Sequence, residues 1–261
     1  MPLSLAWATL SLVLAAVLLG GLVKGVAGFG YAVTSTALLA MLLDPAAAVT
    51  VMILPTLVAN VPLLAELERD KLRSCVRRFW PFVAAALVGT LAGMAVLDRV
   101  PKAYLALGLG LVTFAYVLSA QPYRELPGSG SLATRLFRPS TATKLWMGLA
   151  SGLVFGASNI AVQIVAYLDR LDLDRATFVG VLAMILVGVS TVRVGAAWTL
   201  GLYGTGSLLA LSGVAVVPGL VGVFAGGRLR PSIPEGVQTG ATLGLLVVIA
   251  ARLTTAGLGG L

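Results

Sequence analysis

Two residue types that carry much of enzyme chemistry are absent or nearly absent from this sequence of 261 residues. Histidine does not occur at all, which removes the commonest general base and the commonest metal ligand. The single cysteine, Cys75, cannot form an intramolecular disulfide. We therefore predict that the chain is not an enzyme and that it needs no cofactor or metal.

Charged residues are also scarce, and acidic ones most of all. Only 11% of the residues are charged, whereas a soluble domain has about a quarter. All 10 acids fall in loops or at the ends of apolar runs. This placement argues against a buried carboxylate proton relay and against a carboxylate-lined cation site.

Apolar residues in long runs make up most of the chain. They account for 59% of the sequence, and the mean hydropathy is +1.01. These runs predict an all-α polytopic membrane protein. The net charge of +8 would suggest nucleic acid in a soluble protein, but here the bases lie in loops between apolar runs. We expect the lipid bilayer, and no nucleic acid, as a partner.

Two glycine-rich stretches interrupt the apolar runs at matching places. Residues 21–30 begin Gly-Leu-Val-Lys-Gly, and residues 148–159 begin Gly-Leu-Ala-Ser-Gly. Paired breaks at corresponding positions in two halves indicate a transporter binding site. The alternative is that the small residues only allow helices to pack closely.

A polar linker separates two halves in which the same order of features recurs. We predict a first repeat at residues 1–120, a cytoplasmic linker at 121–143 and a second repeat at 144–261. Each repeat is expected to hold a re-entrant or broken-helix hairpin followed by three transmembrane helices. An odd number of crossings in each half gives the two repeats inverted topology.

The positions of lysine and arginine set the predicted orientation. If residues 144–168 form a re-entrant hairpin, the loop bases fall on the cytoplasmic side, apart from Arg99, Lys102 and Arg252. A segment of roughly 25 residues makes two arms of about 18 Å, which reach the midplane and return. The same device at residues 3–43 predicts external N- and C-termini in the cell (inner) membrane.

Two bases lie within apolar runs, Lys24 and Arg193. A membrane interior with fixed positive charge and no fixed negative charge prefers an anion. Each base also has a simpler interpretation. Lys24 ends a run that is nearly long enough to reach the cytoplasmic headgroups, and Arg193 precedes Trp198 near the outer end and could snorkel.

Small and polar residues at the two hairpin tips complete the predicted anion site. An arm that starts at the midplane points its N–H groups and positive dipole end inward. Hydroxyl and amide groups on the following segments can donate further hydrogen bonds, although bonding within or between helices is the alternative for any single hydroxyl. Ser190 holds a place in the second half roughly equivalent to that of Asn60. The predicted substrate-binding residues are Lys24, Gly25, Gly28, Gly30, Thr34, Ser35, Asn60, Gly156, Ser158, Asn159, Gln163 and Arg193.

With these features the chain resembles the sulfite exporter TauE/SafE family over essentially its whole length. The resemblance rests on residues 25–30, Gly-Val-Ala-Gly-Phe-Gly, on residues 44–47, Asp-Pro-Ala-Ala, and on the second glycine break. The second copy departs from the family pattern, because residues 157–159 read Ala-Ser-Asn where the family often has consecutive glycines. The family implies export or permeation of sulfite, of organosulfonates or of related small carboxylates.

These observations together predict a secondary membrane transporter of a small anion, bound near the midplane between the two hairpin tips. Sulfite or an organosulfonate is the expected substrate. An anion channel and a carrier of a small carboxylate are the alternatives, and a homo-oligomer is compatible with the sequence.

Overall fold

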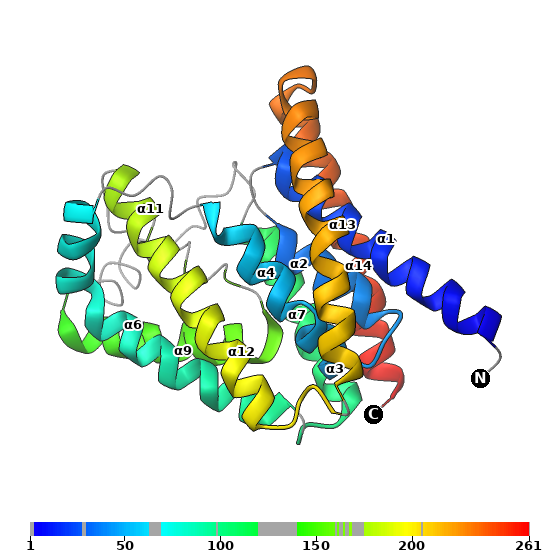
Figure 1. Ribbon diagram of the computed structural model, residues 1–261, viewed down its shortest axis with the longest axis horizontal. Coiled ribbons are helices and arrows are strands. Elements are labelled where there is room, and N and C mark those ends of the chain that lie inside the picture. Colours follow the sequence, from blue (N-terminus) through cyan, green and yellow to red (C-terminus); the bar gives the residue numbers. More distant parts are fainter. Residues whose placement is uncertain are drawn as a thin grey trace. The chain divides into compact units, whose positions relative to one another are not determined.

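The computed structural model describes residues 3–27, 30–62, 69–97, 99–119, 140–159, 161, 164, 167–168, 175–204 and 206–260. Within these segments every regular element is helical, which confirms the predicted all-α class (Figure 1). The elements are α1 (Leu3–Ala27), α2 (Tyr31–Ala40), α3 (Pro45–Val51), α4 (Ile53–Asn60), α6 (Arg69–Leu97), α7 (Lys102–Ser119), α9 (Thr141–Ser158), α11 (Arg175–Ala183), the π-helix η1 (Met184–Val189), α12 (Ser190–Thr199), α13 (Ser207–Leu229), the 3₁₀-helix η2 (Arg230–Ser232) and α14 (Glu235–Gly259). The predicted linker lies outside the described residues as far as residue 139.

Several helices have the length and composition of membrane spans. In the described part of the chain, four are long and apolar enough to cross a membrane: Trp7–Val26, Val76–Leu97, Val181–Thr199 and Ser207–Ser232. Large apolar side chains stay exposed along them, among them Trp80 on α6 and Phe224 on α13. Exposed apolar side chains on long apolar helices fit a lipid surrounding, in which their burial is completed by acyl chains.

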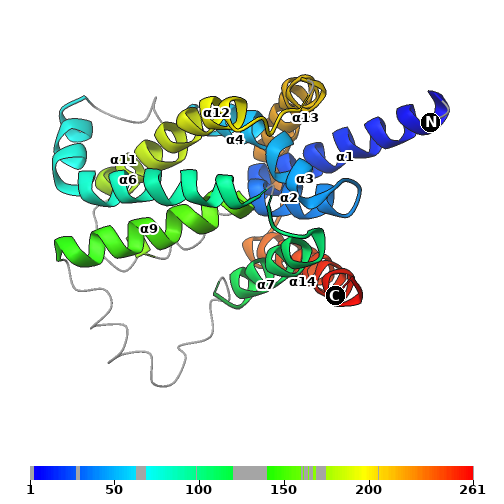
Figure 2. The ribbon, with the colours of Figure 1, turned by 90° about the horizontal axis from the view of Figure 1, so that it is seen from below.

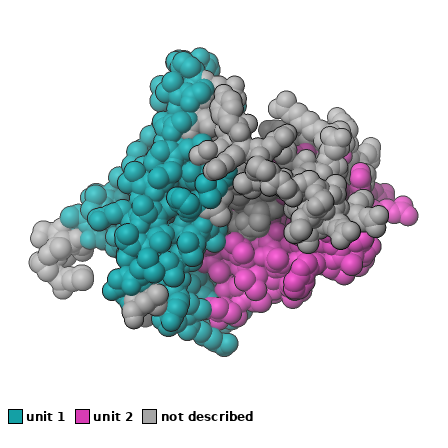
Figure 3. All heavy atoms as spheres, turned by 180° about the vertical axis from the view of Figure 1, so that it is seen from behind, with its two compact units in different colours: residues 1–59, 97–120, 197–261 teal, residues 60–96, 121–196 magenta. Residues whose placement is uncertain are grey.

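The helices pack into two compact units, which Figure 3 colours separately: unit 1 holds residues 1–59, 97–120 and 197–261, and unit 2 holds residues 60–96 and 121–196. Each unit therefore draws helices from both predicted repeats. Packing and internal repetition divide the chain differently, so the repeats themselves stay a prediction.

In unit 1, α1 lies against α13 along a line of glycines that we call the unit 1 seam, namely Gly21, Gly25, Gly222 and Gly226. A side chain at Gly25 would collide with the α13 backbone, since an ideal Cβ would stand 2.6 Å from Gly227 N. An ideal Cβ at Gly226 would stand 2.9 Å from Gly25 Cα. The glycines thus let the two helix backbones touch, as small residues do in membrane helix pairs.

Unit 2 repeats this arrangement with α6 and α9, which lie side by side in two views (Figures 1 and 2). We call its glycines the unit 2 seam, namely Gly89, Gly93, Gly148, Gly152 and Gly156. An ideal Cβ at Gly152 would stand 2.8 Å from Ala86 Cα, and one at Gly93 would stand 3.0 Å from Ala157 N. The matched glycines of the two sequence copies are therefore packing residues within helices, which is the alternative that the sequence left open.

The helix breaks lie just beyond these packing glycines. Gly30 has φ 90°, in the left-handed region, and α2 begins after it. α2 packs back on α1, since an ideal Cβ at Gly20 would stand 3.0 Å from Ser35 N. The first break therefore lies between two packed helices of unequal length, with 25 residues in α1 and 10 in α2.

The second break is at Asn159, after the 18 residues of α9. These residues span about 27 Å at 1.5 Å each, so this arm is longer than the predicted 18 Å. The helix continues through Gly148, Gly152 and Gly156 because α6 fills the space beside them. It ends only where the backbone of Asn159 turns left-handed.

A third close pair in unit 1 joins α7 to α14, which lie together in Figure 2. An ideal Cβ at Gly110 would stand 2.8 Å from Thr254 N, and one at Gly257 would stand 2.6 Å from Leu107 N. In this pair, too, a helix of the first half contacts one of the second half through glycine.

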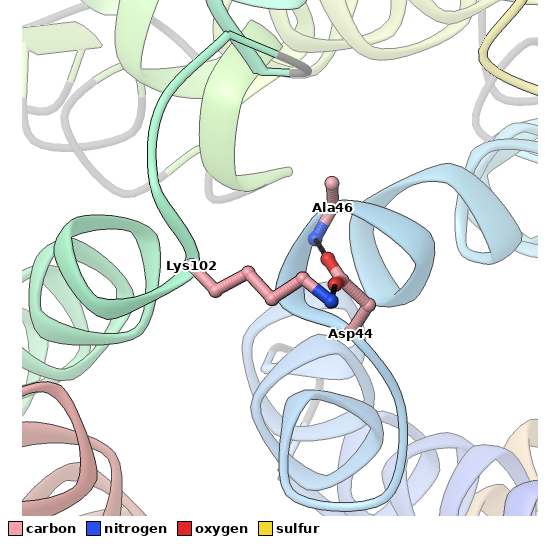
Figure 4. A network of polar contacts seen from close by, with 3 residues as sticks. All are labelled: Asp44, Ala46 and Lys102. Carbon is pink, nitrogen blue, oxygen red and sulfur yellow. Dashed lines mark hydrogen bonds and ion pairs between the residues drawn. The ribbon is translucent and has the colours of Figure 1, made fainter. Parts of the chain in front are cut away.

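The acidic turn before α3 is fixed by its own side chain (Figure 4). Asp44 Oδ1 accepts a hydrogen bond from Ala46 N at 3.0 Å, and Asp44 Oδ2 lies 2.6 Å from Lys102 Nζ. Pro45 occupies the first position of α3, where its missing N–H costs nothing. The Asp-Pro pair thus ends one segment and starts the next.

Replacing Asp44 by alanine should lower the free energy of unfolding by about 1 kcal/mol, because the helix loses its N-cap. Lys102→Ala leaves the cap in place and removes only an exposed ion pair, which contributes less. Thermal unfolding of both variants in detergent measures the difference. Equal losses in the two variants would show that the cap does not stabilise α3.

Candidate functional site

The second break combines a strained backbone position with a polar side chain inside unit 2. Glycines apart, Asn159 is the residue with positive φ in the described chain, at 63°. It is fully buried, and its N–H donates to Phe155 O at 2.8 Å. Asparagine is one of the few residues that adopt this conformation as a single residue, because its short polar side chain can bond locally.

The Asn159 side chain is held by a buried cation. Arg193 Nη1 donates a hydrogen bond to Asn159 Oδ1. Arg193 is 0% exposed, whereas Trp198 on the same helix is 66% exposed. The Arg193 side chain therefore does not extend to the surface of the protein. Its hydrogen bond to Asn159 brings two of the predicted binding residues together.

Phe155 gives the Arg193 guanidinium an aromatic face. The guanidinium carbon lies 4.7 Å from the centroid of the Phe155 ring, a cation–π distance. Phe155 precedes Asn159 by one helical turn on α9, so both side chains lie on the face that meets α12. Phe155 belongs to the buried core of unit 2 with Phe82 and Tyr167, whose rings stack at 4.9 Å.

The helix that carries Arg193 changes geometry just before it. Residues Met184–Val189 are π-helical, and α12 starts at Ser190. Single π-helical turns inside longer helices occur often at functional sites. Ser190 is fully buried one helical turn before Arg193, and its hydroxyl has no hydrogen-bond partner among the described residues.

Unit 1 also places a cation beside its helix break. Lys24 Nζ donates to Ala59 O at 2.8 Å, near the end of α4. It lies 5.9 Å from the centroid of the Tyr31 ring, and Tyr31 is the first residue of α2. Lys24 is therefore directed into unit 1 rather than away from it.

The short helix α2 carries a group of buried hydroxyls. Tyr31, Thr34, Ser35 and Thr36 are buried, and none of their hydroxyls has a hydrogen-bond partner within the described chain. A buried polar group without a partner costs about 1–3 kcal/mol. Several buried hydroxyls without partners on one ten-residue helix therefore require an explanation beyond packing.

Other predicted residues are accounted for by local structure. Gly25 and Gly156 belong to the two seams, and Ser158 Oγ donates to Val154 O of its own helix at 2.6 Å. Asn60 is buried at the end of α4. Gly28 and Gln163 lie outside the described residues. Sequence reasoning missed Phe155 and Tyr31, although each lies within one helical turn of a break.

Comparison with known protein families agrees with this architecture. The model of the family described as Sulfite exporter TauE/SafE matches residues 13–253. Searches of curated proteins and of solved structures found no match. The matched range includes the described helices from within α1 to within α14, both seams and both breaks. The chain therefore belongs to the sulfite exporter TauE/SafE family of membrane transporters.

Proposed function

We propose that this protein is a secondary transporter of a small anion, sulfite or an organosulfonate, in the cell membrane. The observation that carries the proposal is the fully buried Arg193, hydrogen-bonded to Asn159 at a helix break. A charge inside an apolar segment is costly, and such residues mark substrate or ion pathways. A guanidinium suits an oxyanion, because its planar N–H groups match two oxygens at once.

The sign of the buried charge favours an anion over a cation. The two bases inside apolar segments are Lys24 and Arg193, and all 10 acids lie in loops or at the ends of apolar runs. With a negative cell interior, exit of a monovalent anion is favoured by about 2.3 kcal/mol per 100 mV. Export therefore needs no intramembrane carboxylate.

Unit 1 holds a second group of residues suited to an oxyanion. Lys24 lies beside the start of α2, whose first-turn N–H groups have no partner inside the helix. The buried hydroxyls of Thr34 and Ser35 follow within that helix. Backbone N–H groups at a helix start, a cation and hydroxyls together form a usual environment for a bound oxyanion.

The two seams support an inverted repeat. By the match between the glycine stretches, α1 corresponds to α9, and the order of helices then pairs α13 with α6. The α1–α13 and α6–α9 contacts are therefore equivalent pairs, and in both of them glycines allow the two helix backbones to touch. A two-fold relation between repeats produces such equivalent pairs. Transporters with inverted repeats place the substrate near the midplane, where helices are broken.

Flux into proteoliposomes tests the function. The purified chain should transport sulfite and a small alkanesulfonate with saturation. A rate that rises linearly with concentration to high values would indicate the channel alternative. A preference for acetate over both sulfur anions would indicate a carboxylate carrier. No flux of any of these anions would contradict the proposal.

Reporter fusions test the proposed orientation, with both termini outside. Fusions after residues 135 and 172 should report the same, cytoplasmic side if the segment between them enters and returns. A fusion after residue 203 should report the outer side. Opposite sides for 135 and 172 would contradict the hairpin, whatever the substrate proves to be.

A further inference from the structure

Ser190 is the buried hydroxyl of unit 2 that lies on the same helix as Arg193. The two residues are one turn apart on α12, and side chains with this spacing share a helix face. Both are 0% exposed. Whatever anion reaches Arg193 from this face therefore lies within reach of the Ser190 hydroxyl.

Ser190 differs from two hydroxyls near it, those of Thr191 and Ser158, which bond to their own helices. Thr191 Oγ1 donates to Val187 O at 2.8 Å, and Ser158 Oγ donates to Val154 O at 2.6 Å. Ser190 makes no such bond within the described chain. It directly follows the π-helical turn Met184–Val189. The Ser190 hydroxyl is thus a buried donor without a partner in the described chain, on the helix that carries Arg193.

We propose that Ser190 selects anions with three oxygens, such as sulfite and sulfonates, over carboxylates. This inference rests on the proposed function, because it assigns a role in the same anion site. An arginine fork matches two oxygens, which is all that a carboxylate has. Sulfite and sulfonates carry a third oxygen, which needs another donor. A serine hydroxyl supplies one O–H donor.

The expected effect follows from the loss of one hydrogen bond to a charged group. In Ser190→Ala, methanesulfonate should inhibit sulfite flux roughly 10- to 100-fold less well than in the wild-type chain. Inhibition by acetate should stay the same. The ratio of the two half-maximal inhibitory concentrations in proteoliposomes is the measurement. Thr191→Ala is the matched control, since its exposed hydroxyl bonds to its own helix, and it should keep the wild-type ratio.

Ser190→Cys separates hydrogen bonding from packing. Cysteine keeps the volume of the side chain but is a weak donor, so this variant should behave like Ser190→Ala. A wild-type ratio in Ser190→Ala, or in Ser190→Cys alone, would overturn the selectivity role while leaving the transporter proposal intact. Absence of sulfite flux in the wild-type chain would overturn the proposed function and this inference with it.

Discussion

Replacing Arg193 by glutamine should lower sulfite flux in proteoliposomes by at least about 100-fold. Loss of one partner from a buried, hydrogen-bonded charged contact costs about 2–5 kcal/mol of binding, and about 1.4 kcal/mol corresponds to tenfold. Glutamine keeps an N–H donor but removes the charge and shortens the side chain. Initial rates at fixed sulfite concentration, with protein incorporation measured in the same vesicles, give the result.

The matched control for this variant is Arg228→Gln. Arg228 also places its guanidinium over a phenyl ring, 4.2 Å from the Phe224 centroid, but it is exposed at the end of α13. The control should keep wild-type flux, because it loses the same kind of contact outside the site. Flux within about threefold of wild type in a folded Arg193→Gln protein would exclude the buried arginine from the pathway.

Stability should respond to the Arg193 change in the opposite sense from function. Burying a charge costs several kcal/mol, and a neutral glutamine at this position avoids that cost. Thermal unfolding in detergent should therefore show Arg193→Gln as stable as the wild-type chain or more stable. A variant that is both inactive and strongly destabilised would indicate a structural role instead.

Adding a single methyl group to the unit 2 seam should strongly destabilise the protein. In Gly152→Ala the new Cβ would meet the Ala86 backbone, 2.8 Å from its Cα, so α6 and α9 must move apart. Overpacking of this kind costs about 1–3 kcal/mol. Thermal unfolding in detergent, or unfolding by a denaturing detergent, measures the loss.

Gly195→Ala is the control for the seam. Gly195 lies in α12 of the same unit, and an added Cβ there would meet no atom within 4 Å. Since alanine is the better helix former by about 1 kcal/mol, this variant should be neutral or slightly stabilised. The same substitution in two helices of one unit is therefore expected to act with opposite signs. Equal effects would remove the seam as the cause.

The sequence predicted the helical class and the family, because apolar runs and paired glycine stretches are visible in a linear pattern. It did not distinguish glycines that break a helix from those that pack one. Gly25 and Gly30 look alike in sequence. Gly25, however, packs against α13, whereas the backbone of Gly30 is left-handed. The difference depends on which helix lies opposite, and that helix is distant in the chain.

The contacts of the candidate site could be predicted only in part, for a similar reason. The apolar run around Arg193 indicated its depth in the membrane, and Trp198 suggested an outer position. Depth does not fix the rotation of a helix about its axis, which decides whether a side chain faces lipid or protein. The π-turn at Met184–Val189 adds to that rotation and leaves no signature in the apolar pattern. The sequence therefore named Arg193 and Asn159 as site residues, but their direct contact is visible only in the folded chain.

The unit 1 seam also constrains how the protein is made. α1 leaves the ribosome well before its partner α13, because nine described helical segments separate the two in the chain order α1 (Leu3–Ala27) to α13 (Ser207–Leu229). α7 likewise packs against a later helix, α14. Until α13 and α14 have been made, the glycine faces of α1 and α7 lack their final neighbours. The packing of unit 1 is therefore completed only after both of these later helices have been made.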